Sequence, residues 1–192
     1  LLSLSVTPNY LEQIGFIDIN QANKANEDPI GLLMKKALDG VVIVPWAIML
    51  DKWRAALFSG KIDESNLNES WWELREKYQG IAPPIDRPEN FFDPGAKYHI
   101  PANTPYTRYF LASIMQYQFH EALCNAINFD GPLHECSIYD SKKAGERVIS
   151  TMALGQSVPW QDAFEKLTGS RELSGKSILN YYAPLKNWLD EQ

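Results

Sequence analysis

The sequence of 192 residues has little of several features that whole classes of protein need. Basic residues do not predominate, because 18 Lys and Arg stand against 24 Asp and Glu, for a net charge of −6. Nucleic-acid-binding chains show a basic face or stripe for the phosphates, so we exclude that class. The most apolar run, residues 41–50, ends at Asp51. It is shorter than the roughly 18 residues that a membrane-spanning helix needs, so we expect no span.

Glycine and proline are too few for a disordered chain. The sequence has 11 Gly and 12 Pro, whereas 45% of its residues are apolar and 8 Phe, 6 Trp and 9 Tyr supply aromatic surface. Such a chain buries about 70% of its unfolded surface, as one domain or part of a larger one. The uncharged first six residues are too short for a signal peptide and follow no Met. We therefore expect the sequence to begin inside a longer protein.

Helix signals dominate, which predicts an all-α, mainly helical fold with minimal β structure. We expect helices at 8–14, 69–78, 141–154, 160–167 and 173–188, the last broken by Pro184. Residues 30–58 should form two helices or one bent helix, with interruptions at Gly40 and Pro45. Thr104 is the expected cap of the longest helix, which runs to about residue 129. Six prolines between 81 and 105 exclude regular helix there. We expect an ordered loop with one short strand at 98–100.

Two cysteines and one tripeptide favour an oxidising, secretory setting. Cys124 and Cys136 lie twelve positions apart and can form one disulfide, and Asn68 begins an acceptor sequence for N-linked sugar. The alternative is two reduced thiols and a chance tripeptide.

The sequence lacks the two-His zinc helix of metallopeptidases. His120 and Cys124 share one helix face, and His134 and Cys136 would complete a His2Cys2 set. We favour a disulfide that joins the end of the long helix to the turn at 131–133, with His120 as a structural residue.

A second cluster combines Lys97, His99, Tyr106, Arg108 and Tyr109. An extended backbone at 97–99 would direct Lys97 and His99 to one side, and Tyr106 and Tyr109 lie one helical turn apart. Such donors suit a carboxylate or an oxyanion. Spacing alone also fits a solvated face with two core aromatics.

Trp71 and Arg75 form a third candidate, four apart on one expected helix. An indole N–H beside a guanidinium can bind a small anion. The alternative is a core Trp with Arg75 stacked on it.

Several of these strings together resemble the C-terminal part of the angiotensin-converting enzyme family, which are zinc peptidyl-dipeptidases. The similarity covers essentially the whole chain in order, through residues 71–80, 92–101, 104–110, 117–124 and 131–134. The resemblance implies a two-lobed helical ellipsoid with a deep central cleft, secreted or carried as a membrane-anchored ectodomain. It also implies that residues 1–192 are a partial catalytic domain, with no second domain, that starts just after the last zinc ligand. All zinc ligands would lie upstream, so we expect the chain alone to bind no catalytic metal and to be inactive.

The resemblance also assigns roles to four residues. Lys97 and Tyr106 match the residues that bind the carboxylate at the C-terminus of an oligopeptide substrate. His99 matches the proton donor, and Tyr109 matches the Tyr that stabilises the tetrahedral intermediate. Fixing the free C-terminus two residues beyond the metal would release dipeptides.

Chloride is a second cofactor that the resemblance implies. Trp71 and Arg75 match one chloride site, and Arg108 matches the other. Ile43 and Ser113 stand where familiar members carry Phe around the last substrate residue, so the side-chain preference there stays open. The alternative function is a non-catalytic family member that acts as a binding ectodomain.

Overall fold

A computed structural model describes residues 1–192 and contains ten α-helices, three short 3-10 helices and no strand. The all-α prediction is therefore confirmed. The chain forms two compact units, one of residues 1–37 and 114–192 and the other of residues 38–113. Helices α3 (Ile30–Gly40) and α6 (Thr107–Ala126) belong partly to each unit.

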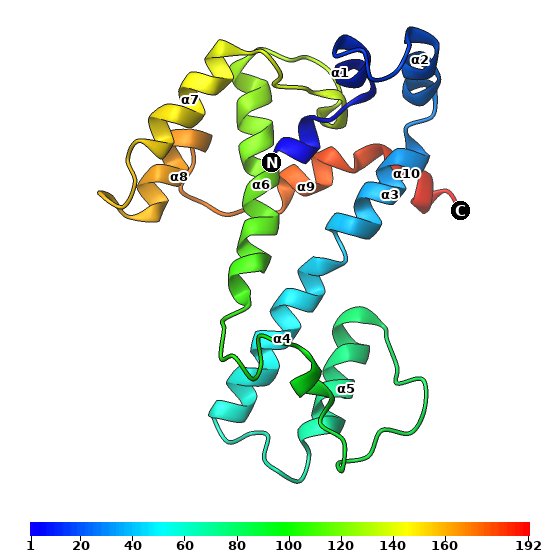
Figure 1. Cartoon of the computed structure of the whole chain (residues 1–192), viewed down its shortest axis with the longest axis vertical. Helices are drawn as coiled ribbons and strands as arrows, with labels where there is room; N and C mark the ends of the chain where they lie inside the picture. The colour runs from blue at the N-terminus through cyan, green and yellow to red at the C-terminus, as the bar shows by residue number, and fades with distance from the viewer. The chain divides into compact units, whose positions relative to one another are not determined.

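The first unit holds most of the helices (Figure 1). Apart from its parts of α3 and α6, they are η1 (Leu2–Ser5), α1 (Pro8–Gln13), α2 (Ile19–Glu27), η3 (Leu133–Glu135), α7 (Lys142–Met152), α8 (Trp160–Thr168), α9 (Lys176–Tyr181) and α10 (Ala183–Asp190). The side chain of Thr7 caps α1 by accepting the amide of Tyr10 at 3.2 Å, as its sequence position predicts. The chain also breaks between α9 and α10, where Pro184 stands in the first turn of α10.

Helix α2 is one element that sequence reasoning missed. Asp18 and Gln21 form a reciprocal capping box at its start, each side chain accepting the other's backbone amide at 2.9 Å. This pattern was a readable signal for a helix beginning at Ile19.

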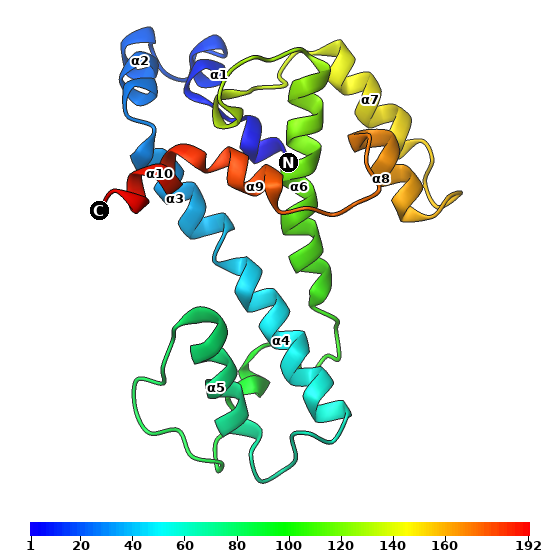
Figure 2. The ribbon, with the colours of Figure 1, turned by 180° about the vertical axis from the view of Figure 1, so that it is seen from behind.

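The core of the first unit lies between α6, α7 and α8. Leu123, Ala144 and Leu167 are buried there, and α7 and α8 lie side by side in both views (Figures 1 and 2). A disulfide joins Cys124 on α6 to Cys136, which follows η3. The segment after η3 therefore stays fixed to the end of the long helix.

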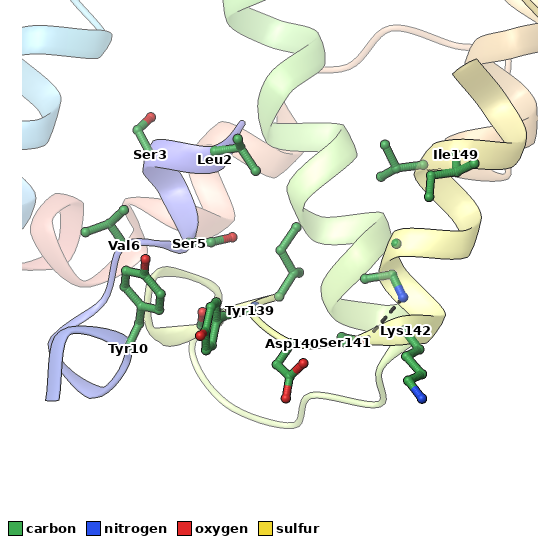
Figure 3. A pocket seen from close by; sticks show the side chains of 15 residues that line it. Leu2, Ser3, Ser5, Val6, Tyr10, Tyr139, Asp140, Ser141, Lys142 and Ile149 are labelled. Atoms are coloured by element: carbon green, nitrogen blue, oxygen red, sulfur yellow. Dashed lines mark hydrogen bonds between the residues drawn. The ribbon is translucent and has the colours of Figure 1, made fainter. Parts of the chain in front are cut away.

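A mostly apolar cavity of about 630 Å³ lies in the same unit (Figure 3). Its walls come from the first ten residues, including Leu2, Val6 and Tyr10, and from residues 137–149, including Tyr139 and Ile149. A second groove of about 410 Å³ has Lys36 on its wall.

The second unit is built on α4 (Ile43–Phe58) and α5 (Leu67–Gln79), which pack against each other, with η2 (Asp93–Ala96) against α5 (Figure 1). Its buried core includes Trp53, Trp71 and Tyr106. The expected two-helix form over 30–58 is confirmed, and the break falls at residues 41–42, directly after the expected interruption at Gly40; Pro45, the other expected interruption, lies inside α4. Pro45 is tolerated because it stands in the first turn of α4, where backbone donors have no partner within the helix.

The expected strand at 98–100 is wrong, because this segment forms successive turns. The amide of Ile100 donates to the carbonyl of Lys97 at 2.8 Å, and the amide of Thr104 donates to that of His99 at 3.0 Å. These local bonds use the donors that a neighbouring strand would need.

Candidate functional site

The segment that carries Lys97 is anchored through the carboxylate of Asp93. That carboxylate accepts hydrogen bonds from Trp72 Nε1 at 2.8 Å, Arg87 Nε at 2.9 Å and Asn68 Nδ2 at 3.1 Å. The hydrogen bonds from Arg87 are the main reason that the pKa of Asp93 lies well below its usual range. Asp93 therefore stays charged and fixes η2, which ends just before Lys97.

Arg54 of α4 binds the turn that carries His99. This buried guanidinium donates to Oδ1 of Asn103 at 2.7 Å and to the carbonyls of Thr104 and His99. Asn103 has a φ of 48°, in the left-handed region that Asn tolerates better than most residues. The turn is therefore bound to α4 at His99 and again at residues 103–104.

Asp51, one turn before Arg54, caps the start of α6. Its Oδ2 accepts the amides of Tyr106 and Thr107, at 2.8 and 2.5 Å, and the hydroxyl of Thr107 at 2.7 Å. Burial raises the pKa of Asp51, but these bonds and the Arg54 charge outweigh it and lower the pKa overall. The expected cap by Thr104 is wrong, since its hydroxyl donates to Ala102 instead. A carboxylate binds exposed helix amides better than a hydroxyl does.

With both anchors in place, the aromatic members of the predicted substrate site converge. The ring of His99 stands edge-on to Tyr106 and Tyr109, with centroids 4.7 and 5.6 Å apart, and the two Tyr rings are 4.6 Å apart. His99 Nε2 lies 3.3 Å from the hydroxyl of Tyr109. Tyr106 is buried, whereas Tyr109 is 38% exposed.

Lys97 joins the same group. Its ammonium lies 5.1 Å from the ring centroid of Tyr106, although residues 97–99 form turns and not the extended backbone that we expected. Lys97, His99, Tyr106 and Tyr109 therefore form one cluster with two acid–base groups and two phenols. It can bind an anionic group and donate hydrogen bonds to an oxyanion.

Trp46 belongs to this cluster and was missed from the sequence. Its indole N–H donates to the hydroxyl of Tyr106 at 3.2 Å, and its ring lies 6.0 Å from the ammonium of Lys97. The position of Trp46 in the apolar run 41–50 predicts burial but carries no signal for this contact.

The Trp71 and Arg75 pair lies beside Trp46. The guanidinium of Arg75 stacks over Trp46 and Trp72, 4.9 and 5.6 Å from their centroids, and the ring of Trp71 meets that of Trp46 edge-on at 5.6 Å. Nε of Arg75 is buried and makes no hydrogen bond, and burial lowers the pKa of this guanidinium. A buried cationic donor without an acceptor fits a small anion such as chloride.

Arg108 is exposed on α6, and its guanidinium makes no hydrogen bond or ion pair. It makes no hydrogen bond, ion pair or cation–π contact with the other predicted site residues. Ser113 is buried and donates to the carbonyl of Tyr109 at 2.7 Å, and Ile43 begins α4.

The residues of this chain do not fit zinc. Ligand atoms of His120, Cys124 and Cys136 lie within 4.8 Å of one another, but both sulfurs are in the disulfide and offer no thiolate. His120 is fully buried with Nε2 3.2 Å from the carbonyl of Leu133, and burial lowers its pKa to about 4. This supports a structural His120.

Asn68 is a poor acceptor for the predicted sugar. Its side chain is fully buried, and Nδ2 donates both to the carbonyl of Arg87 at 2.9 Å and to Asp93. Glycosylation would replace a hydrogen of this same nitrogen. The folded structure therefore argues against a glycan at Asn68.

Each helix of the chain is either too short or too polar for a membrane span. The peptidase M2 family model, described as angiotensin-converting enzyme, matches residues 1–192. Angiotensin-converting enzyme of Oryctolagus cuniculus is 46% identical over 98% of the chain and 14% of its own length. That of Theromyzon tessulatum is 45% identical over 100% of the chain and 31% of its own length. The angiotensin-converting enzyme-like protein Ace3 of Mus musculus is 42% identical over 98% of the chain and 26% of its own length. The chain thus spans less than a third of the length of each of these relatives.

Proposed function

The chain belongs to the angiotensin-converting enzyme family of peptidases, and we propose that it is the part of a peptidyl-dipeptidase domain that anchors the substrate's C-terminus. The observation that carries the proposal is the convergence of Lys97, His99, Tyr106 and Tyr109 on one aromatic cluster. These four residues are the ones that the family resemblance assigns to substrate binding and catalysis.

In this proposal the carboxylate of an oligopeptide binds to Lys97 and Tyr106. A carboxylate accepts hydrogen bonds only, and an ammonium and a phenol both donate. The low polarity around the buried Tyr106 strengthens the attraction. Holding the C-terminus at a fixed place makes the position of the cleaved bond depend on distance from that end.

His99 and Tyr109 act at the reacting bond. The hydroxyl of Tyr109 donates a hydrogen bond to the oxyanion of the tetrahedral intermediate, and such a donor is worth about 2.7–4 kcal/mol of barrier. The imidazole of His99, 3.3 Å from that hydroxyl, returns a proton to the leaving amine.

The proposed cofactors are zinc and chloride. Because no residue set here fits zinc, its ligands are proposed to lie outside residues 1–192, and we assign this chain no step at the metal. Chloride is proposed at the orphaned donor of Arg75, one helical turn after Trp71 on α5. An extracellular location is proposed because the disulfide is a bond that persists in oxidising compartments.

The test is release of a dipeptide from an N-blocked tripeptide by the full-length protein that contains this chain. We expect the free-acid peptide to be cleaved, a chelator to stop cleavage, and Tyr109→Phe to lower kcat by about 100-fold or more. The isolated chain with zinc should release nothing. A full-length protein that binds peptides but never cleaves them would instead establish the binding ectodomain.

A further inference from the structure

Trp46 links the two groups of predicted site residues. The edge of its indole bonds to Tyr106, and its ring contacts Trp71, Arg75 and Lys97. Stacking by Arg75 at 4.9 Å and the edge contact of Trp71 at 5.6 Å hold the plane of the ring. Arg75 and Trp71 therefore fix the direction in which the indole N–H of Trp46 points.

The hydrogen bond between Trp46 and Tyr106 can run in one direction only, with Trp46 as the donor. An indole N–H is a donor and never an acceptor, so the phenol oxygen of Tyr106 must be the acceptor, at 3.2 Å. The single hydrogen of that hydroxyl is then left to be donated elsewhere. The hydroxyl of Tyr106 has no other hydrogen-bond partner in the chain.

The neighbouring charge fixes what that hydrogen can meet. Lys97 has three donors and no acceptor, and its ammonium lies 5.1 Å from the Tyr106 ring. Because the Tyr106 oxygen already accepts from Trp46, its hydroxyl can only donate to a ligand. A ligand that binds at Lys97 and Tyr106 therefore meets hydrogen-bond donors and no acceptor. A free carboxylate satisfies both groups, whereas a C-terminal amide brings two hydrogens of its own to the same place.

We propose that Trp46 is a positioning residue that commits the Tyr106 hydroxyl to donation and so selects substrates with a free C-terminal carboxylate. This inference rests on the proposed function. It adds to that function a side chain that acts through Tyr106.

Trp46→Phe tests the inference in the full-length protein, because it keeps an aromatic ring against Arg75 and removes the N–H. The substrates are one N-blocked tripeptide as the free acid and as the C-terminal amide. We expect KM for the acid to rise about fivefold, as for the loss of one neutral hydrogen bond, with kcat changed less than twofold. KM for the amide should stay constant. An equal rise for both peptides would overturn the proposal.

Trp53→Phe is the matched control. Trp53 also lies on α4 and is fully buried, but its N–H donates to Leu67 and Ser70 and not to the site. We expect this variant to lose stability while the ratio of the two KM values stays at the wild-type level. A changed ratio in Trp53→Phe would show that any damage to α4 has the same effect, and would refute a specific role for Trp46.

A second variant keeps the test decisive if Trp46→Phe folds poorly. Tyr106→Phe removes the acceptor of the same hydrogen bond, so it must lower acid-over-amide selectivity at least as much. Adding Trp46→Phe to it should lower the selectivity no further. Unchanged selectivity in Tyr106→Phe would overturn the inference.

Dipeptide binding separates this inference from the proposed function. Calorimetry with a product dipeptide, as acid and as amide, needs no turnover. If the wild type cleaves nothing but prefers the acid, and Trp46→Phe loses that preference, the peptidase is refuted and the role of Trp46 is supported. If the wild type cleaves the peptide, and Trp46→Phe prefers the acid over the amide as strongly as the wild type does, only the inference is refuted.

Discussion

The cap that Asp51 places on α6 yields a prediction that hydrogen exchange at the start of this helix can test. Asp51→Asn keeps the size of the side chain and removes its charge. In the wild type one carboxylate oxygen accepts both the Tyr106 and Thr107 amides, and these residues begin the helix that carries Tyr109. Weakening the cap should therefore open this helix start before any other part of the second unit.

The size of the effect follows from the bonds that are lost. Hydrogen bonds to a charged group contribute about 1.5–3 kcal/mol each, and replacing a helix cap costs about 0.5–2 kcal/mol. Asparagine retains one acceptor oxygen, so we expect a loss of about 1–2 kcal/mol. This corresponds to amide exchange about 5–30-fold faster at Tyr106 and Thr107.

Hydrogen exchange followed by mass spectrometry, on the peptide around residues 104–110 of the full-length protein, is the assay. Glu89→Gln is the matched control, because Glu89 accepts the amides of Asn68 and Glu69 at the start of α5, at 2.9 and 2.7 Å. It should speed exchange at α5 and leave residues 106–107 protected. Equal protection of residues 106–107 in Asp51→Asn and the wild type would refute the cap.

The same cap should depend on pH. Because the folded state lowers the pKa of Asp51, its contribution is fully present above the ordinary value of 3.8 and is lost as the pH falls through the lower, folded value. The difference between the wild type and Asp51→Asn should narrow below pH 3.8 and be constant above it.

Three further outcomes are expected. Replacing Cys124 and Cys136 by Ser should lower the free energy of unfolding by about 2–4 kcal/mol, measured by urea unfolding, and no loss would contradict a stabilising disulfide. His120, with a pKa of about 4 against an ordinary 6.5, should cost the protein about 3 kcal/mol of stability as the pH falls from 6.5 to 4, since the unfolded state takes up the proton first. His120→Gln should flatten this slope in pH-dependent melts. Protein secreted from eukaryotic cells should carry no sugar at Asn68, and a glycopeptide in its digest would show that the buried amide had been modified before folding.

Local chemistry predicted most of the helices. The caps at Thr7 and Ser141, the left-handed Gly80 after α5 and the break before Pro184 all act within a few residues, so the sequence carries them directly. Gly40 marked the break between α3 and α4, whereas Pro45 does not interrupt α4, because a proline in the first turn of a helix removes no hydrogen bond within the helix. The capping box of α2 was equally local and was overlooked.

The cluster around Tyr106 was predicted only in part. The resemblance identified Lys97, His99, Tyr106 and Tyr109, but the strand expected at 98–100 and the cap expected from Thr104 were wrong. Local turn bonds replace the strand, and Arg54 of α4, 45 residues before His99, binds the turn that they form. The cap of α6 comes from Asp51 of α4, 56 residues before Thr107.

The sequence by itself determined the helical class, the family and the residue types that can bind a carboxylate. Only the tertiary structure decided that Asp51 and Arg54 hold the loop, that Trp46 bonds to Tyr106, and that Asn68 is buried. The physical reason is the separation along the chain of the residues that interact. Capping and turn preferences depend on neighbours in the chain, whereas a hydrogen bond between α4 and a loop beyond α5 depends on how distant segments pack.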